Sequence, residues 1–194
     1  MTRYYFVMTT ETDSRLAALL YRLVGLVRSR EQATILNPVQ WEALRYLHWA
    51  NRFSASPKGA TEYLGSTKGT VSQTLIALEK KGLIEKRQDA EDKRKIHLVL
   101  TPAGQELLTQ DPQALLEEDL KSLPEDQRRL MEEAMENLLR VGLQRSGGKR
   151  FGFCRSCRHF REDAEEGAPY FCSLLGEPLA QMDADRICLE HDAA

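Results

Sequence analysis

Apolar residues recur at helical spacing along most of this 194-residue chain, and two short β-leaning runs interrupt them near its middle. From Ser14 to about Arg30, leucines and valines follow a period of 3.6 residues, which predicts a helix with a broad apolar stripe. Asn37-Pro38 supplies a cap and a proline at the first helical position, so a second helix is expected up to about Ala50. Ser56-Pro57 starts a third, shorter helix in the same way.

A further helix with one apolar face is predicted between Gly65 and Gly82. The hydroxyl of Ser66 or Thr67 caps its amino end, and Gly82 stops it after two lysines that suit the negative end of the helix dipole. Three apolar residues recur at helical spacing on its packed face: Val71, Leu75 and Leu78. Its other faces carry short polar side chains, which suit base edges in the major groove of DNA. The predicted DNA contacts of this helix are therefore Thr67, Lys68, Thr70, Ser72, Gln73 and Thr74.

The two β-leaning runs, 83–87 and 95–100, follow this helix and are joined by the charged connector 88–94, which predicts a β-hairpin. The cations of the hairpin suit the flanking phosphate backbone or the minor groove, where negative potential is concentrated. Its predicted DNA contacts are Arg87, Lys93, Arg94 and Lys95. From residue 66 to 100, eight Lys and Arg oppose five Asp and Glu, a local charge of +3 on a chain with net charge −2. Basic charge is therefore concentrated in this helix and hairpin.

More helical patterns follow the hairpin. Thr101 caps a short helix, Asp111-Pro112 restarts or kinks it, and the run Ser122 to Glu125 begins a long helix that ends near Arg145. The buried face of this last helix is expected at Met131, Ala134, Met135, Leu138 and Val141. From residue 111 to 145, nine acidic residues outnumber five basic ones, a net charge of −4. This half of the chain should therefore stand away from DNA.

The helix and hairpin share a specific pattern with one family of proteins. The helix reads TKGTVSQTL followed by LEKKGLI, and the hairpin follows a D-x-R-D-x-R signature that leads into a strand ending in Leu-Thr. The residues that match the hairpin pattern are Asp89, Asp92, Arg94, Leu100, Thr101 and Gly104, whereas Glu91 takes the place of the usual arginine. In these features the chain resembles the winged helix-turn-helix of the MarR family of bacterial transcription regulators. The resemblance covers roughly residues 11 to 145.

This resemblance implies a mainly α-helical fold with a small β wing, a winged helix-turn-helix with a helical dimerisation region. It implies a homodimer that binds a pseudo-palindromic site in double-stranded DNA, because the first helix packs with the last two across a two-fold axis in the family. The apolar stripes on residues 14–30 and 124–145 support this, since they exceed what one small winged helix can cover. A small-molecule effector is also implied; His48 and Trp49 are candidates for its pocket, although such groups more often serve packing.

The tail, Lys149 to Ala194, follows a flexible Ser146-Gly147-Gly148 and is too short for a self-sufficient apolar core. It contains all four cysteines of the chain: Cys154, Cys157, Cys172 and Cys188. Clustered cysteines in a reducing compartment favour metal ligation over disulfides. The sequence thus predicts two parts, a winged helix-turn-helix and dimerisation domain at 1–146 and a cysteine-rich module at 149–194 that a metal holds together.

Two kinds of metal site fit the cysteine spacing. Zinc would be bound by the four thiolates, or by three of them with His191 replacing Cys172, and His159 is a weaker candidate. An iron–sulfur cluster would use the four sulfurs alone. We favour zinc slightly, because it fits both close pairs and needs no assembly machinery. Free cysteines without a ligand, or a redox disulfide, are the remaining interpretations.

The sequence favours regulation over catalysis. It contains no clear acid–base constellation, and a four-cysteine metal site leaves no open position for an activated water. No apolar run approaches 18 residues and the amino terminus lacks a long apolar segment, so we expect a cytoplasmic protein without membrane contact. The signal is expected to be either a small molecule or a redox or iron signal at the cysteine tail.

Overall fold

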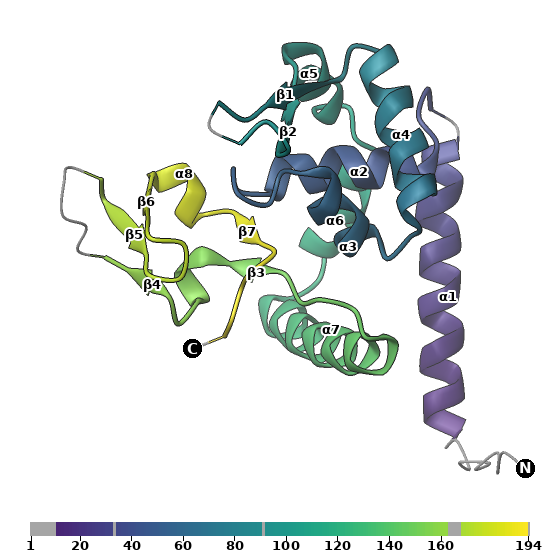
Figure 1. Cartoon of the computed structure of the whole chain (residues 1–194). Coiled ribbons are helices and arrows are strands. Elements are labelled where there is room, and N and C mark those ends of the chain that lie inside the picture. Colours follow the sequence, from purple (N-terminus) through teal and green to yellow (C-terminus); the bar gives the residue numbers. More distant parts are fainter. Residues whose placement is uncertain (1–10, 33, 91, 163–167, 194) are drawn as a thin grey trace, which may run out of the picture.

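The structure is a computed structural model that describes residues 11–32, 34–90, 92–162 and 168–193. The first part of the chain forms a winged helix-turn-helix with added helices, which confirms the predicted fold class (Figure 1). Its elements are α1 (Glu11–Gln32), α2 (Pro38–Trp49), α3 (Pro57–Leu64), α4 (Lys68–Lys80), β1 (Ile84–Gln88), β2 (Ile96–Leu100), α5 (Pro102–Leu108), α6 (Gln113–Lys121) and α7 (Glu125–Ser146). No described helix is both long enough and apolar enough to cross a membrane. Glu91, the departure from the family's wing pattern, lies outside the described residues.

Local capping signals fix the boundaries of the predicted helices. The side chains of four cap residues accept hydrogen bonds from backbone N–H groups in the first turns of α2, α3, α4 and α5: Asn37, Ser56, Thr67 and Thr101. Gly65 and Gly82 adopt φ of 57° and 69°, the left-handed conformation that favours glycine, and they make the turns on either side of α4. The helix-turn-helix is therefore encoded by short-range sequence signals.

The core of this part lies where α2, α3, α4 and the β1–β2 hairpin meet. Trp41, Leu44 and Tyr46 of α2 are fully buried there. The three residues predicted on the packed face of α4 join them, together with Ile84 of β1 and Leu98 of β2: Val71, Leu75 and Leu78. The antiparallel hairpin pairs Ile84 with Leu100 and Gln88 with Ile96. This packing holds α4 against the core by one face and leaves its opposite face to solvent.

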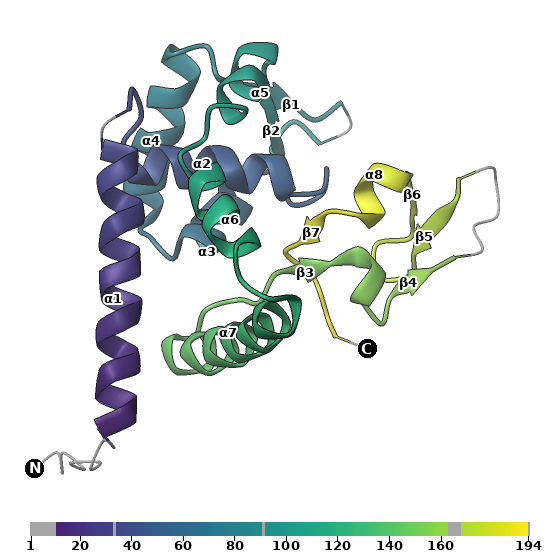
Figure 2. The same cartoon turned by 180° about the vertical axis from the view of Figure 1, so that it is seen from behind.

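The predicted buried face of the last long helix is wrong for the single chain. No residue of α7 is buried, and Leu138 and Leu139 are 54% and 63% exposed. Similarly, Glu31 is the one buried residue of α1. Figures 1 and 2 show α1 and α7 lying apart within one chain. The packing across a two-fold axis that the family resemblance implies needs a second copy and stays a prediction. The periodicity correctly identified apolar stripes, but a stripe is buried only where a partner covers it.

The tail forms a small module of short strands on the opposite side of the core from α1 (Figures 1 and 2). It begins after Gly147, whose φ of 67° ends α7. Its elements are β3 (Gly152–Phe153), a 3-10 turn (Cys154–Ser156), β4 (Phe160–Arg161), β5 (Tyr170–Cys172), β6 (Glu177–Leu179), α8 (Gln181–Ala184) and β7 (Ile187–Cys188). Strands β4, β5 and β6 form one antiparallel sheet, and β3 pairs with β7.

The module is docked on the winged helix-turn-helix. Ile187 of β7 belongs to the main hydrophobic core and forms a parallel bridge with Ala50 at the end of α2. Phe151, which precedes β3, packs edge-on against the rings of Tyr46 and Tyr63, with ring centroids 5.8 and 5.1 Å away. The division at residues 146–149 stays a prediction, and the two predicted parts share an interface.

Candidate nucleic-acid interface and cysteine site

The exposed face of α4 carries most of the predicted base contacts. Lys68, Thr70, Ser72 and Gln73 are exposed. The hydroxyl oxygen of Thr67 accepts from the Thr70 N–H at 3.2 Å as the helix cap, and Thr74 is half-buried with its hydroxyl donating to the Thr70 carbonyl at 3.0 Å. The structure therefore places five of the six predicted residues on the exposed surface, with Thr74 half-buried. The Thr67 and Thr70 hydroxyls also lie 2.9 Å apart, so the three threonine hydroxyls have partners within the helix.

The predicted cations of the wing also reach the surface, although acidic neighbours pair with two of them. Arg87 lies 2.8 Å from Glu85, and Arg94 lies 3.0 Å from Asp92. The hydrogen bonds from Arg94 lower the pKa of Asp92. The Arg94 side chain is still 91% exposed, and Lys93 and Lys95 are exposed beside it. The tip therefore presents basic groups, with part of their charge offset locally.

A groove of about 580 Å³ lies beside this surface, between α3, α4 and the wing. Three lysines from these three elements line it: Lys58, Lys68 and Lys86. Sequence reasoning had selected Lys68 alone, because nothing in the local pattern shows that Lys58 and Lys86 approach it. Lys86 is paired with Glu79 at 2.6 Å. The groove thus extends the basic surface from the recognition helix to the start of α3.

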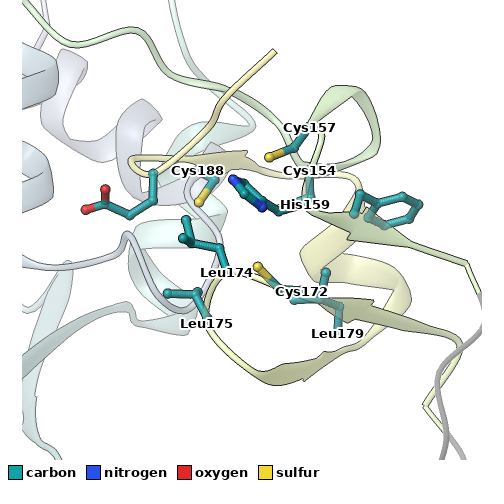
Figure 3. Close-up of a pocket in the computed structure, with 10 residues that line it drawn as sticks. Cys154, Cys157, His159, Cys172, Leu174, Leu175, Leu179 and Cys188 are labelled. Atoms are coloured by element: carbon teal, nitrogen blue, oxygen red, sulfur yellow. The ribbon is translucent and has the colours of Figure 1, made fainter. Parts of the chain in front are cut away.

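The tail brings the four predicted cysteines together. Cys154, Cys157, Cys172 and Cys188 line one pocket with His159, Glu190 and several apolar side chains. Figure 3 shows the Cys157, Cys172 and Cys188 sulfurs pointing toward the hollow, with the His159 ring between them. All four cysteines are free. Residues that are up to 34 positions apart in sequence therefore meet at one place.

The structure reverses the preference between the two histidines that the sequence offered as metal ligands. His159 lines the cysteine pocket, whereas His191, which the sequence favoured of the two, is not among the lining residues. The His191 ring packs against Gly152, and its Nε2 lies 3.0 Å from the Ser156 hydroxyl. The short spacing between Cys188 and His191 misled the sequence interpretation, because Glu190 still lines the pocket but the next side chain, His191, lies against Gly152 and Ser156.

Polar groups of the winged helix-turn-helix contact the two buried thiols. The Asn51 side-chain N–H donates to the Cys154 sulfur at 3.3 Å. A hydrogen bond from Cys154, with further bonds from Asn51 and Ser54, lowers the pKa of Cys188 despite its burial. The same bond to Cys188, followed by burial, raises the pKa of Cys154.

The donor set of the pocket suits a thiophilic metal by its chemistry, since four thiols and one imidazole are the ligands that zinc prefers. Within the described part of the chain, however, no three His, Cys, Asp or Glu side chains are positioned to hold a metal ion together. The cysteines share a pocket, and an ion would require their sulfurs to approach one another more closely.

The effector candidates His48 and Trp49 do not line the groove or the cysteine pocket. Both side chains are exposed at the end of α2, and their rings lie 5.4 Å apart. Trp49 also faces Phe153 of the tail edge-on at 6.4 Å. These contacts favour the packing interpretation of the two residues.

The first part of the chain is similar to a known protein family. Residues 36–95 match the model of the MarR family, in agreement with the resemblance seen in the sequence. No curated protein matches this chain in sequence.

Solved structures share the fold. A MarR transcriptional regulator from Methanosarcina mazei Go1 is 21% identical with a TM-score of 0.55, and 70% of this chain covers 99% of that one. The MepR–DNA complex from S. aureus is 20% identical with a TM-score of 0.54, covering 69% of this chain and 99% of that one. FabT from Streptococcus pneumoniae in complex with DNA is 20% identical with a TM-score of 0.53, and the match covers 67% of this chain and 94% of that one. About three-tenths of this chain therefore has no counterpart in these structures.

Proposed function

We propose that this chain, whose residues 36–95 carry the MarR-family winged helix-turn-helix, is a transcription regulator that binds a pseudo-palindromic DNA site as a homodimer. The observation that carries the proposal is the open polar face of α4. Its buried face fixes the helix on the core, and the exposed side chains of Ser72 and Gln73 are available to base edges in a major groove, with the exposed Thr70 beside them. MepR and FabT, which share the fold, have been solved with DNA.

The distribution of charge supports the same orientation on DNA. Lys58, Lys68 and Lys86 line the groove beside the recognition helix, and the wing adds exposed basic residues at its tip. These cations would neutralise phosphates on both sides of the major-groove contact. The acidic segment from residue 111 to 145 forms α6 and α7, away from the wing (Figure 1).

The exposed apolar stripes of α1 and α7 support dimerisation. Leu16, Leu19 and Val24 on α1 are about as exposed as Leu138 on α7. Contiguous apolar surface of this kind favours association with a second copy across a two-fold axis. Light scattering of the full chain should report a dimer, and a stable monomer at micromolar concentration would contradict this part of the proposal.

A selection of genomic fragments with the purified protein tests DNA recognition. Two recognition helices related by a two-fold axis require two half-sites about one helical turn, roughly 10 base pairs, apart. We expect the recovered sites to share an inverted repeat with that spacing. If the recovered fragments have no common two-fold motif, the proposed function is wrong.

For the tail we propose a metal site on Cys154, Cys157, Cys172 and Cys188, with zinc preferred and an iron–sulfur cluster as the alternative. The convergence of all four thiols on one pocket supports it, and His159 is the nitrogen donor in that pocket. Bound zinc would supply folding free energy to a module with little apolar core, whereas a cluster would supply a redox signal. Metal analysis and an absorption spectrum of protein purified without air distinguish the two: iron with sulfide and a brown colour, or one zinc and no colour.

A further inference from the structure

The loop that joins α2 to α3, residues 51–55, lies between the cysteine pocket and the DNA-binding elements. Two of its polar side chains are almost completely buried, with 1% exposure each: Asn51 and Ser54. Burial of polar groups is costly unless they are hydrogen-bonded, so the partners of these two residues determine where the loop can lie.

On one side the loop binds the cysteine module. The Asn51 side-chain N–H donates to the Cys154 sulfur at 3.3 Å, and the Asn51 backbone N–H donates to the Ile187 carbonyl at 2.9 Å. The Ser54 hydroxyl accepts from the Leu189 N–H at 2.8 Å. The loop thus contacts the Cys154 sulfur directly, its Asn51 and Ser54 side chains also reach Cys188, and it binds the backbone on both sides of Cys188.

On the other side the same loop holds the DNA-binding elements. The Asn51 side-chain oxygen accepts from the Ser54 N–H at 2.9 Å, which closes the turn. The backbone carbonyl of Ala55, the residue after Ser54, accepts from the Leu98 N–H of β2 at 2.8 Å. The side chain of the following residue, Ser56, caps α3. A change in the position of the Asn51 amide would therefore reach both the wing and the start of the helix-turn-helix.

We propose that the loop 51–55 couples the state of the cysteine pocket to DNA binding, with Asn51 as the positioning residue that joins the two. This inference rests on the proposed function, because it names the route by which the tail would regulate the DNA-binding site. The hydrogen bond from the buried Asn51 side chain to the Cys154 sulfur is the direct contact between the loop and the proposed ligands. Ligation of the thiols by a metal changes that acceptor and the position of the sulfurs, and the Asn51 amide is the group that responds.

The substitution Asn51→Asp separates the two roles of this side chain. Aspartate has the same shape and keeps an oxygen for the Ser54 N–H, but it removes the donor that faces Cys154. Asn37→Asp is the matched control: it makes the same change at the other end of α2, where the side chain acts only as an acceptor for the Gln40 N–H and aspartate caps a helix equally well.

The experiment measures DNA affinity by fluorescence anisotropy on the selected site, with full-length reduced protein either treated with chelator or saturated with zinc alone. We expect zinc to change the wild-type affinity by at least about fivefold, the lower range of measured allosteric couplings. Asn37→Asp should keep this ratio, and Asn51→Asp should bring it near one. Equal wild-type affinity with and without zinc, or an unchanged ratio in Asn51→Asp, would overturn the proposal.

Hydrogen exchange on the wild type gives a second readout that does not depend on a variant. Zinc should slow exchange of the amides at residues 54–56 and 98, and unchanged exchange there, or no uptake of zinc, would overturn the coupling. Absence of sequence-specific binding in both states would instead refute the proposed function, and the exchange data would then decide the coupling alone.

Discussion

The helix-turn-helix core and the cysteine module are both small, but they are stabilised in different ways. The first buries large apolar side chains completely, among them Trp41, Leu44 and Leu75. The second buries fewer and mostly smaller groups, and its Ile187 is inserted into the core of the first; the other buried residues of the second are Cys154, Leu179, Asp183, Ala184, Cys188 and Leu189. Asp183 is paired with Arg52 of the α2–α3 loop at 2.7 Å. One region therefore contains its own source of folding free energy, whereas the other depends on docking and on whatever binds its cysteines.

The largest expected effect comes from removing one thiol of the module. Cys157→Ser should expose residues 150–193 to proteolysis while the helix-turn-helix stays protected, because ligand binding is expected to supply most of the module's folding free energy. Limited proteolysis with mass spectrometry of the fragments measures this. Met182→Ala, a change at an exposed residue of α8, should leave the module as resistant as in the wild type. A module that stays resistant in Cys157→Ser and contains no metal would show that docking alone stabilises it.

The reverse test removes apolar volume from the first region. Leu75→Ala deletes a fully buried side chain of α4 and should lower the free energy of unfolding by about 2–5 kcal/mol. Chemical denaturation followed by circular dichroism gives this value. Leu115→Ala, at a half-exposed position of α6, should cost far less. Equal losses in the two variants would mean that the core of α2, α3 and α4 is not the main source of stability.

The same contrast explains how much the sequence could predict. The helix-turn-helix was predicted nearly to the residue, since Asn37, Thr67 and Gly82 act within one turn of the chain. The prediction of a buried face on α7 was wrong for the single chain, because burial of that face depends on a partner and not on the periodicity of its apolar residues.

In the tail, spacing brought the cysteines together in the prediction but ordered the histidines wrongly. The close spacing of Cys188 and His191 favoured His191, whereas His159 lines the pocket and His191 contacts Ser156 instead. The contact between Asn51 and Cys154 joins residues 103 positions apart, so no local pattern contains it. Sequence thus predicts what short-range geometry determines, and it misses what docking determines.

The proposed role of the first region in DNA recognition can be tested at one side chain of α4. Gln73→Ala removes an exposed amide from the proposed major-groove face and should cost about 1–3 kcal/mol of affinity for the selected site. Affinity for unrelated DNA should hardly change, because an amide carries no charge for phosphates. Binding titrations on the selected site and on a scrambled site measure the difference. An equal loss on both sites would contradict a base-reading role.

The smallest expected effect concerns the wing. Arg94→Ala removes an exposed cation whose partner, Asp92, lies 3.0 Å away, so part of its charge is already offset within the protein. We expect a modest loss of affinity on every DNA sequence and a decrease of about one in the slope of log affinity against log salt, as for the loss of one phosphate contact. Titrations at several salt concentrations give the slope. Arg129→Ala, the same change within the acidic α7, should leave it unaltered, because that helix is expected to stand away from DNA. An unchanged slope in Arg94→Ala would show that Arg94 does not contact a phosphate. Lys93 and Lys95 would then be the remaining candidates at the tip of the wing.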